Sequence, residues 1–254
     1  MSTSNTRIII LAAGEGKRMN AGKPKVLVEV AGKSIVARQL EAIRASGVDA
    51  SPILVIAPGE AGEQIRQATA EFNPTYVVQD EQLGTGHAVQ VCREAAGDAE
   101  NIMVLYGDHP LYTSESFIRL HDKHLASDAT LTLATVDVGD YQDWRAGYKV
   151  FGRIIRDSTG NFSSIVENKD ATEAQLSQTE VNPGWYCFKS LWLWTHIKNL
   201  SSDNAQKEYY LTDLLQMAVD QGETISSVSI SPEEAHGINT PEQLKEVEEM
   251  LGSN

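Results

Sequence analysis

The chain has 254 residues, of which 41% are apolar and 22% are charged, a composition typical of a globular protein with a substantial core. Its 35 acidic residues outnumber 21 basic ones, and the formal net charge of −14 argues against a nucleic acid or an anionic membrane as partner. The two cysteines are too few for a disulfide framework. The first apolar stretch, Ile8–Ala13, is too short for a signal peptide, and no run approaches the roughly 18 residues of a membrane span. We therefore expect a cytoplasmic protein.

The first half of the chain alternates short apolar runs with amphipathic segments. The apolar runs predict buried strands at residues 7–13, 53–57, 75–79, 102–106 and 129–137. The amphipathic segments predict helices at residues 34–46, 60–71, 87–96 and 114–126. Ser34 is expected to cap the first helix and Gly47 to end it. Alternation at this spacing predicts βαβ units, and hence a parallel sheet with helices on both faces.

After residue 138 this alternation changes. Loops join the next predicted strands, so some antiparallel pairing is expected; these strands are residues 148–156, 162–167 and 181–188. A helix at 208–221, a strand at 224–230 and a final helix beginning at Thr240-Pro241 complete the chain. Without an internal repeat or a low-complexity linker, residues 1–254 are predicted to form a single domain. Its expected fold class is α/β: a Rossmann-like, mixed, mainly parallel sheet flanked by helices, with a smaller antiparallel part.

Three polar or glycine-rich turns follow predicted parallel strands, where ligands bind in open α/β sheets. They are Gly14-Glu15-Gly16, the segment that begins at Gln79, and Gly107-Asp108. Glycines after a strand allow backbone N–H groups to approach phosphate oxygens. Their convergence at one edge predicts a binding site for an anionic ligand.

The first turn lacks two familiar phosphate-binding patterns. Met19 stands where a dinucleotide-binding fingerprint requires a third glycine, and Pro24 stands where a P-loop requires Ser or Thr. The cations Arg18, Lys23 and Lys25 nevertheless lie in the same loop, an arrangement that suits a polyphosphate.

Taken singly, the polar candidates also have ordinary structural explanations. Asp108 would serve as a turn or helix-cap residue, Asn239 as a turn residue before the last helix, and Lys25 as a surface lysine. His121 and His124 are three residues apart on a predicted helix, and we assign them to its exposed face.

Segments in the same order resemble the sugar-nucleotide pyrophosphorylases. The pattern LAAGxGxRM at 11–19, followed by PKVL at 24–27, resembles their signature loop. Residues 79–88 resemble the uridine-binding segment of bacterial N-acetylglucosamine-1-phosphate uridylyltransferases. The resemblance covers about residues 7–250 and includes residues 105–111, 152–154, 165–172, 180–182, 206–213 and 237–239.

The resemblance implies a nucleotide-diphospho-sugar transferase fold, with a nucleotide-binding half at about 1–110 and a sugar-binding half at about 111–254. It implies nucleotide contacts from Leu11, Ala12, Ala13, Gly14, Lys25, Gln79, Gly84, Thr85 and Gly107. It implies sugar contacts from Gly152, Glu167, Lys169 and Asn182. It also implies Mg²⁺ as cofactor, with Asp108 and Asn239 as ligands. Arg18 and Lys25 are our candidates for the catalytic cations that would neutralise charge in the reaction.

The implied reaction is transfer of UMP from UTP to N-acetylglucosamine 1-phosphate, giving UDP-N-acetylglucosamine and pyrophosphate. The attacking phosphate oxygen is already ionised, so catalysis would need positioning and charge neutralisation rather than a general base. One alternative is another sugar-1-phosphate nucleotidyltransferase, acting on glucose 1-phosphate or using another base. The second alternative is a non-catalytic nucleotide-sugar binding module.

The chain departs from the family pattern in three site positions and in length. Lys17 replaces a usual Thr or Ser, His109 replaces a small apolar residue, and Pro183 replaces a usual Thr. Many relatives continue into a hexapeptide-repeat β-helix with acetyltransferase activity, and the chain has no such repeats. We therefore expect no acetyltransferase activity and a monomer.

Overall fold

The computed structural model describes residues 5–14, 19, 22–204 and 206–252. Its main feature is a ten-stranded sheet in the order β5-β4-β1-β6-β11-β7-β10-β8-β9, with β12 paired to β7. The strands of this sheet are β1 (Thr6–Leu11), β4 (Ile53–Ile56), β5 (Thr75–Val78), β6 (Asn101–Tyr106), β7 (Leu131–Asp137), β8 (Arg153–Arg156), β9 (Phe162–Val166), β10 (Glu180–Val181), β11 (Tyr186–Lys189) and β12 (Ile225–Ser229). A separate hairpin pairs β2 (Glu29–Val30) with β3 (Lys33–Ser34).

Parallel pairing dominates the first half of the chain and antiparallel pairing the second. Strands β5, β4, β1 and β6 are all parallel. Strand β11 then pairs antiparallel with β6 and β7, and the β10-β8-β9 group is antiparallel throughout. The expected mixed sheet with an antiparallel part is confirmed.

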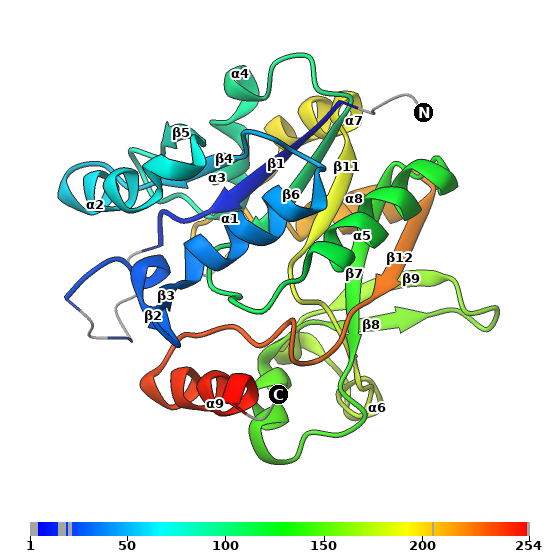
Figure 1. The fold of residues 1–254 in the computed structure, drawn as a ribbon. Coiled ribbons are helices and arrows are strands. Elements are labelled where there is room, and N and C mark those ends of the chain that lie inside the picture. Colours follow the sequence, from blue (N-terminus) through cyan, green and yellow to red (C-terminus); the bar gives the residue numbers. More distant parts are fainter. Residues whose placement is uncertain (1–4, 15–18, 20–21, 205, 253–254) are drawn as a thin grey trace.

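Helices cover both faces of the sheet, as predicted (Figure 1). The α-helices are α1 (Ile35–Ser46), α2 (Glu60–Thr69), α3 (Thr85–Gln90), α4 (Arg93–Ala96), α5 (Ser114–Ser127), α6 (Glu173–Leu176), α7 (Ser190–His196), α8 (Asp213–Asp220) and α9 (Pro241–Gly252). Short 3₁₀ helices are η2 (Lys25–Leu27), η3 (Ala70–Phe72), η4 (Asp143–Val150), η5 (Asn168–Asp170) and η6 (Ile197–Asn199). Among the described residues, no helix is long and apolar enough to cross a membrane.

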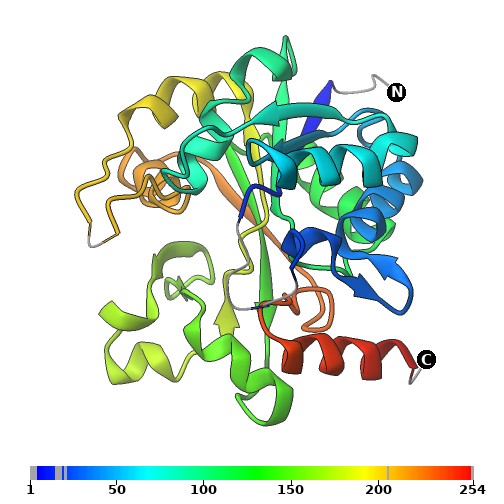
Figure 2. The same cartoon turned by 90° about the vertical axis from the view of Figure 1, so that its left-hand side faces the viewer.

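The alternation of side chains along β1 divides the core into two clusters. Ile8 and Ile10 pack with α1, α2 and α5 on one face, whereas Ile9 packs with α3, α4, α7 and α8 on the other. Because successive strand residues point to opposite faces, a strand covered on both sides reads as a continuous apolar run. Figure 2 shows the segment from η4 to α6 (green to yellow-green) at the lower edge of the molecule, beside α9 (red).

The predicted boundaries of α1 are confirmed. The Ser34 hydroxyl accepts a hydrogen bond from the Ala37 N–H at 3.3 Å, and Gly47 adopts a left-handed φ of 69° after the last turn. A hydroxyl cap of this kind stabilises a helix by about 1 kcal/mol. Local sequence therefore sets both ends of this helix.

The parallel register places the three predicted turns at one edge of the sheet. Leu11, the last residue of β1, is paired with Val55 of β4 and with Tyr106 of β6. Ile56 is paired with Val78, the last residue of β5. Gly14, Gln79 and Gly107 consequently follow strands that end at the same edge of the sheet, and the convergence expected from the sequence is confirmed.

Two predicted strands in the second half are wrong in part. Residues 148–156 contain the end of η4 and only a short strand, β8, because Tyr148 packs in the core against Trp144 and Phe151. Residues 181–188 are split into β10 and β11. Pro183 lacks the N–H that a central strand requires, and Gly184 has a φ of 82°.

Two predicted helices are also wrong in part. The helix expected at 87–96 begins earlier and is divided into α3 and α4. The helix expected at 208–221 begins only at Asp213, because its first residues bond to another segment. The Tyr209 N–H donates to Leu83 O at 2.8 Å, and the Leu211 N–H donates to Thr85 Oγ1 at 3.0 Å. These tertiary bonds replace the first helical turn.

The assignment of His124 to an exposed face is wrong. Its side chain is buried, with Nδ1 2.9 Å from Thr132 Oγ1 and Nε2 3.1 Å from Asn101 Oδ1. Burial lowers its pKa to about 4, so the imidazole is neutral near pH 7. His124 therefore belongs to the packing between α5 and the sheet.

Candidate active site

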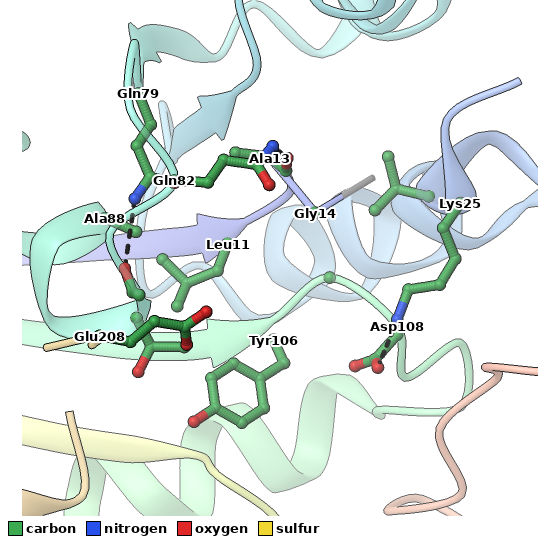
Figure 3. A pocket seen from close by; sticks show the side chains of 14 residues that line it. Leu11, Ala13, Gly14, Lys25, Gln79, Gln82, Ala88, Tyr106, Asp108 and Glu208 are labelled. Carbon is green, nitrogen blue, oxygen red and sulfur yellow. Dashed lines mark hydrogen bonds and ion pairs between the residues drawn. The ribbon is translucent and has the colours of Figure 1, made fainter. Parts of the chain in front are cut away.

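A cavity of about 310 Å³ opens at the carboxyl ends of β1, β5 and β6 (Figure 3). The predicted nucleotide-binding residues in its wall are Leu11, Ala13, Gly14, Lys25, Gln79, Gly84, Thr85 and Gly107. Ala12 is not in the wall. It lies in the core, and its N–H donates to Val55 O at 2.9 Å. We refer to this space as the first cavity.

The turn after β5 is held in place by Gln79. Its side-chain amide donates to Gly84 O at 3.2 Å and lies 3.1 Å from His87 Nδ1. Gly84 has a φ of 102°, and an added Cβ there would lie 2.7 Å from Tyr209 O. Backbone conformation and close approach both require glycine at this position. The turn thereby brings Thr85 to the cavity wall.

Five wall residues were not predicted as contacts from the sequence: Val26, Gln82, Ala88, Tyr106 and Glu208. Gln82 donates to Ala13 O at 2.7 Å and so joins the turns after β5 and β1. Tyr106 is the last residue of β6, and Glu208 belongs to the segment that precedes α8. Gln82 and Glu208 lie within the segments that resemble the family, but no local pattern distinguishes them from surface residues.

A second cavity, of about 480 Å³, lies beside the first, and most of its wall comes from the second half of the chain. Of the predicted sugar-binding residues, Gly152, Glu167 and Asn182 line it. Lys169 is exposed in η5 and lies in neither wall. Wall residues that the sequence did not predict as contacts include Tyr148, Phe151, Thr212 and Gly237, together with His109 and Pro183 at two of the departures from the family pattern.

The two cavities meet at Asp108, which lines both, as does Tyr106. Lys25 Nζ lies 2.7 Å from Asp108 Oδ2 and 3.1 Å from Asn239 Oδ1. The Asn239 amide lies 3.4 Å from the same carboxylate oxygen. Figure 3 shows the Lys25 side chain reaching down to Asp108. These three residues, distant in sequence, form one polar cluster.

The cluster keeps Asp108 ionised. Burial acts to raise the pKa of this carboxyl, but His109 and Lys25 outweigh it and hold the pKa well below its usual range. His109 Nδ1 lies 2.9 Å from Asp108 Oδ1, and the His109 ring stacks on Tyr112 with 5.2 Å between centroids. A negative charge is therefore fixed at the junction of the cavities.

The cluster suits a divalent cation such as Mg²⁺. A carboxylate oxygen of Asp108 and the amide oxygen of Asn239 converge on one cationic group, the Lys25 ammonium. Oxygen ligands of this kind are those that Mg²⁺ prefers, and it commonly takes only one or two from protein. No group of three or more His, Cys, Asp or Glu side chains in the described part of the chain is arranged to hold a metal. Phosphates and water would supply the remaining ligands.

Two predicted features of the glycine-rich loop lie outside the described residues. They are Arg18, expected to be catalytic, and the departure at Lys17.

Comparison with known proteins identifies the family of the chain. The profile of the MobA-like NTP transferase domain matches residues 8–207. Over 96% of the present chain, the sequence is 37% identical to the bifunctional protein GlmU of Clostridium novyi. Over 94% of the present chain, it is 41% identical to the bifunctional protein GlmU of Psychrobacter sp.. It spans about half the length of these relatives, 51% and 50% respectively.

Solved structures share the fold at low sequence identity. A putative glucose-1-phosphate thymidylyltransferase from Bacillus anthracis superposes with a TM-score of 0.75 at 18% identity, covering 96% of this chain and 94% of that one. A CMP:2-keto-3-deoxy-manno-octonic acid synthetase complexed with CTP superposes with a TM-score of 0.73 at 15% identity, covering 98% and 99%. Together with the family match over most of its length, these findings place the chain in the MobA-like NTP transferase family, and it is a nucleotidyltransferase.

Proposed function

We propose that the protein transfers UMP from UTP to N-acetylglucosamine 1-phosphate, giving UDP-N-acetylglucosamine and pyrophosphate, in a Mg²⁺-dependent reaction. In this proposal residues 1–254 act as one nucleotidyltransferase domain, with the nucleotide in the first cavity and the sugar phosphate in the second. The relatives named GlmU and the motif order from the glycine-rich turn to Asn239 support this choice.

The observation that carries the proposal is the polar junction between two adjoining cavities. A transfer reaction requires its donor and its acceptor to meet, and Asp108 lines both spaces. Lys25 reaches it from η2, and Asn239 reaches it from the turn before α9. A protein that only bound a nucleotide would need no second cavity sharing this carboxylate.

In the proposed reaction a phosphate oxygen of the sugar 1-phosphate attacks the α-phosphorus of UTP. The bond from that phosphorus to the oxygen bridging to the β-phosphate breaks, and the electron pair leaves with pyrophosphate. No proton needs to be removed from the attacking oxygen, which is ionised near neutral pH. The protein supplies position and positive charge, and Lys25 is the cation that the geometry places at the junction.

Asp108 and Asn239 would hold Mg²⁺ when it binds. The cation would neutralise the charge of two polyanionic reactants, which otherwise repel each other. The protein's own part is to keep Asp108 ionised, through Lys25 and His109, so that its carboxylate oxygens are available as ligands.

The decisive experiment is pyrophosphate release from UTP, CTP and dTTP, each combined with N-acetylglucosamine 1-phosphate or glucose 1-phosphate. Reactions are run with Mg²⁺ and with Mg²⁺ removed by a chelator. We expect turnover with UTP and N-acetylglucosamine 1-phosphate, and loss of turnover with the chelator. Efficient use of CTP or dTTP over UTP would overturn the assignment of the base.

The same assay, with calorimetry, separates the remaining candidates. A preference for glucose 1-phosphate would favour a different sugar-1-phosphate nucleotidyltransferase. Binding of a UDP-sugar without pyrophosphate release from any pair would favour a non-catalytic binding module. The thymidylyl- and cytidylyltransferase-like structural neighbours are the reason for including dTTP and CTP.

A further inference from the structure

Arg153 is a buried cation that takes no part in the proposed reaction. It begins β8, and its side chain is only 2% exposed. The guanidinium bonds to two backbone carbonyls, Phe151 O and, at 3.1 Å, Lys149 O. It also lies over the ring of Tyr141, 4.9 Å from the centroid. Among the described residues, no carboxylate forms an ion pair with it. Burial of a cation without an acidic partner is costly, so its contacts require a reason.

One of these carbonyls belongs to Phe151, a wall residue of the second cavity, and the other belongs to Lys149, which lies between the wall residues Tyr148 and Val150. Tyr148, Val150, Phe151 and Gly152 line that cavity, whereas Arg153 itself does not. The guanidinium therefore lies behind this wall and holds it from the side away from the cavity. Its planar fork can bond two carbonyls at once, which a lysine ammonium cannot do with the same geometry.

Fixing Phe151 O also fixes the next N–H. The peptide bond is planar and trans, since the described residues contain no cis peptide, so the Phe151 carbonyl and the Gly152 N–H point in opposite directions. The carbonyl points toward Arg153. The Gly152 N–H consequently points away from Arg153, on the side where Gly152 lines the cavity.

Further contacts lock Gly152 in the same arrangement. Its carbonyl accepts a hydrogen bond from the Asn182 N–H at 2.9 Å. An added Cβ would lie 2.8 Å from Ile165 Cγ2, so a side chain here would disturb the wall. Within the described part of the chain, the Gly152 N–H has no acceptor. A backbone donor held in this way is suited to a ligand oxygen.

We propose that Arg153 is a positioning residue, which holds the Phe151–Gly152 peptide so that the Gly152 N–H faces the second cavity and binds an oxygen of the acceptor. The identity of that acceptor as a sugar 1-phosphate rests on the proposed function. Arg153 touches neither reactant and acts only through this peptide.

The test compares Arg153→Met, which removes both donors, with Arg153→Lys, which keeps the charge. Arg156→Met is the matched control, since Arg156 lies on the same strand but pairs with Glu180. In Arg153→Met we expect the KM for the sugar 1-phosphate to rise about tenfold, the loss typical of one hydrogen bond. The KM for UTP should stay within about twofold, because the first cavity shares no wall residue with this peptide. Arg153→Lys should recover part of the loss, and Arg156→Met should show none.

A second readout needs no substrate. Amide hydrogen exchange of the free protein should increase at residues 147–152 in Arg153→Met, with no increase at residues 79–88. Unchanged exchange at 147–152 overturns the proposal, even if no sugar phosphate proves to be a substrate. A parallel rise in both KM values also overturns it, because that pattern indicates a general loss of structure. An inactive parent protein with increased exchange in the variant would refute the proposed function and support the role of Arg153.

Discussion

The first and second cavities are built by different means, although they share one carboxylate. The wall of the first cavity comes mainly from the ends of three parallel strands of one sheet, β1, β5 and β6, and the turns that follow them, at residues 11–14, 79–88 and 106–108. The wall of the second comes from separate segments between residues 106 and 243, including η4 and the break between β10 and β11. A parallel sheet edge therefore supplies one site almost by itself, whereas the other requires long-range packing to bring its segments together.

This contrast places different demands on the residues of each wall. The first cavity relies on glycine turns and backbone groups, tied together by side-chain amides such as Gln79 and Gln82. The second relies on buried polar side chains that bond to backbone, such as Arg153 and Asn182. The junction belongs to both, so variants there should affect both reactants and variants elsewhere should affect one.

The largest effect is expected for Asp108→Ala, which removes the group common to both cavities. Pyrophosphate release should fall about 10²–10³-fold, the range found when a single charge-stabilising group is removed. The fold should persist, as measured by circular dichroism. Asp122→Ala is the matched control, because that carboxylate is 70% exposed on α5. Full activity in Asp108→Ala would remove this residue from the site.

The stability of the folded protein in acid should depend on His124. This residue lies at the edge of the sheet opposite the cavities and belongs to neither of them. Its pKa is about 4 in the folded protein against 6.5 unfolded, because burial disfavours the charged form. A lowered folded-state pKa contributes stability above pH 6.5 that is lost as the pH falls toward 4. The difference is worth about 3 kcal/mol.

Urea unfolding at pH 7, 6, 5 and 4 measures this loss. In His124→Gln the dependence on pH should be weaker over this window, while His121→Gln should retain it. Equal dependence in His124→Gln and the parent protein would contradict the assignment. Activity at pH 7 should not depend on His124. This residue of α5 contacts Asn101 at the amino end of β6, whereas the cavities lie at the carboxyl end of that strand.

A smaller effect is expected for Gly184→Ala, at the edge of the second cavity. The added Cβ would lie 2.1 Å from the Tyr106 ring, and the φ of 82° disfavours any side chain. Gly160→Ala is the matched control, since its φ is 85° and its surroundings are open. Both variants carry the backbone strain, so the difference in unfolding free energy isolates the clash, at about 1–3 kcal/mol. Equal stability of the two variants would mean that Tyr106 moves aside freely.

The smallest effects are expected from two variants that should separate the cavities. Gln82→Ala removes the bond to Ala13 O and should raise the KM for UTP about fivefold, leaving the KM for the sugar phosphate unchanged. Asn182→Ala removes the contacts to Tyr186 and to the Gly184 N–H. It should raise the KM for the sugar phosphate and leave the KM for UTP unchanged. Steady-state kinetics with each substrate varied in turn measures both. Equal effects of either variant on both substrates would show that the cavities are not independent.

The sequence predicted the elements that form the first cavity better than those that form the second. The strands that carry the first cavity were predicted within one or two residues, because an apolar run ending in glycine or proline is a local signal. The limits of α1 were predicted for the same reason, from Ser34 and Gly47. The resemblance identified most wall residues of the first cavity, and it also included Ala12, which lies in the core instead. Gln82 and Glu208 were missed, because their roles depend on contacts with distant segments.

The second half was predicted less well, since its backbone responds to tertiary contacts. The helix expected from residue 208 loses its first turns to bonds with Leu83 and Thr85. His124 follows the same rule: its polarity suggested exposure, but Thr132 and Asn101 provide buried partners. Local sequence contains no signal for such partners.

The sequence by itself determined the strand–helix alternation, the placement of glycine turns after parallel strands and the residue types that suit a polyphosphate and a hard cation. These features are local, because hydrophobic period, turn chemistry and ligand type belong to neighbouring residues. Only the tertiary structure decided that Lys25, Asp108 and Asn239 meet at one point and that a buried Arg153 supports the wall of the second cavity. The physical reason is that such contacts depend on packing and register across the whole sheet, which no single segment of the chain specifies.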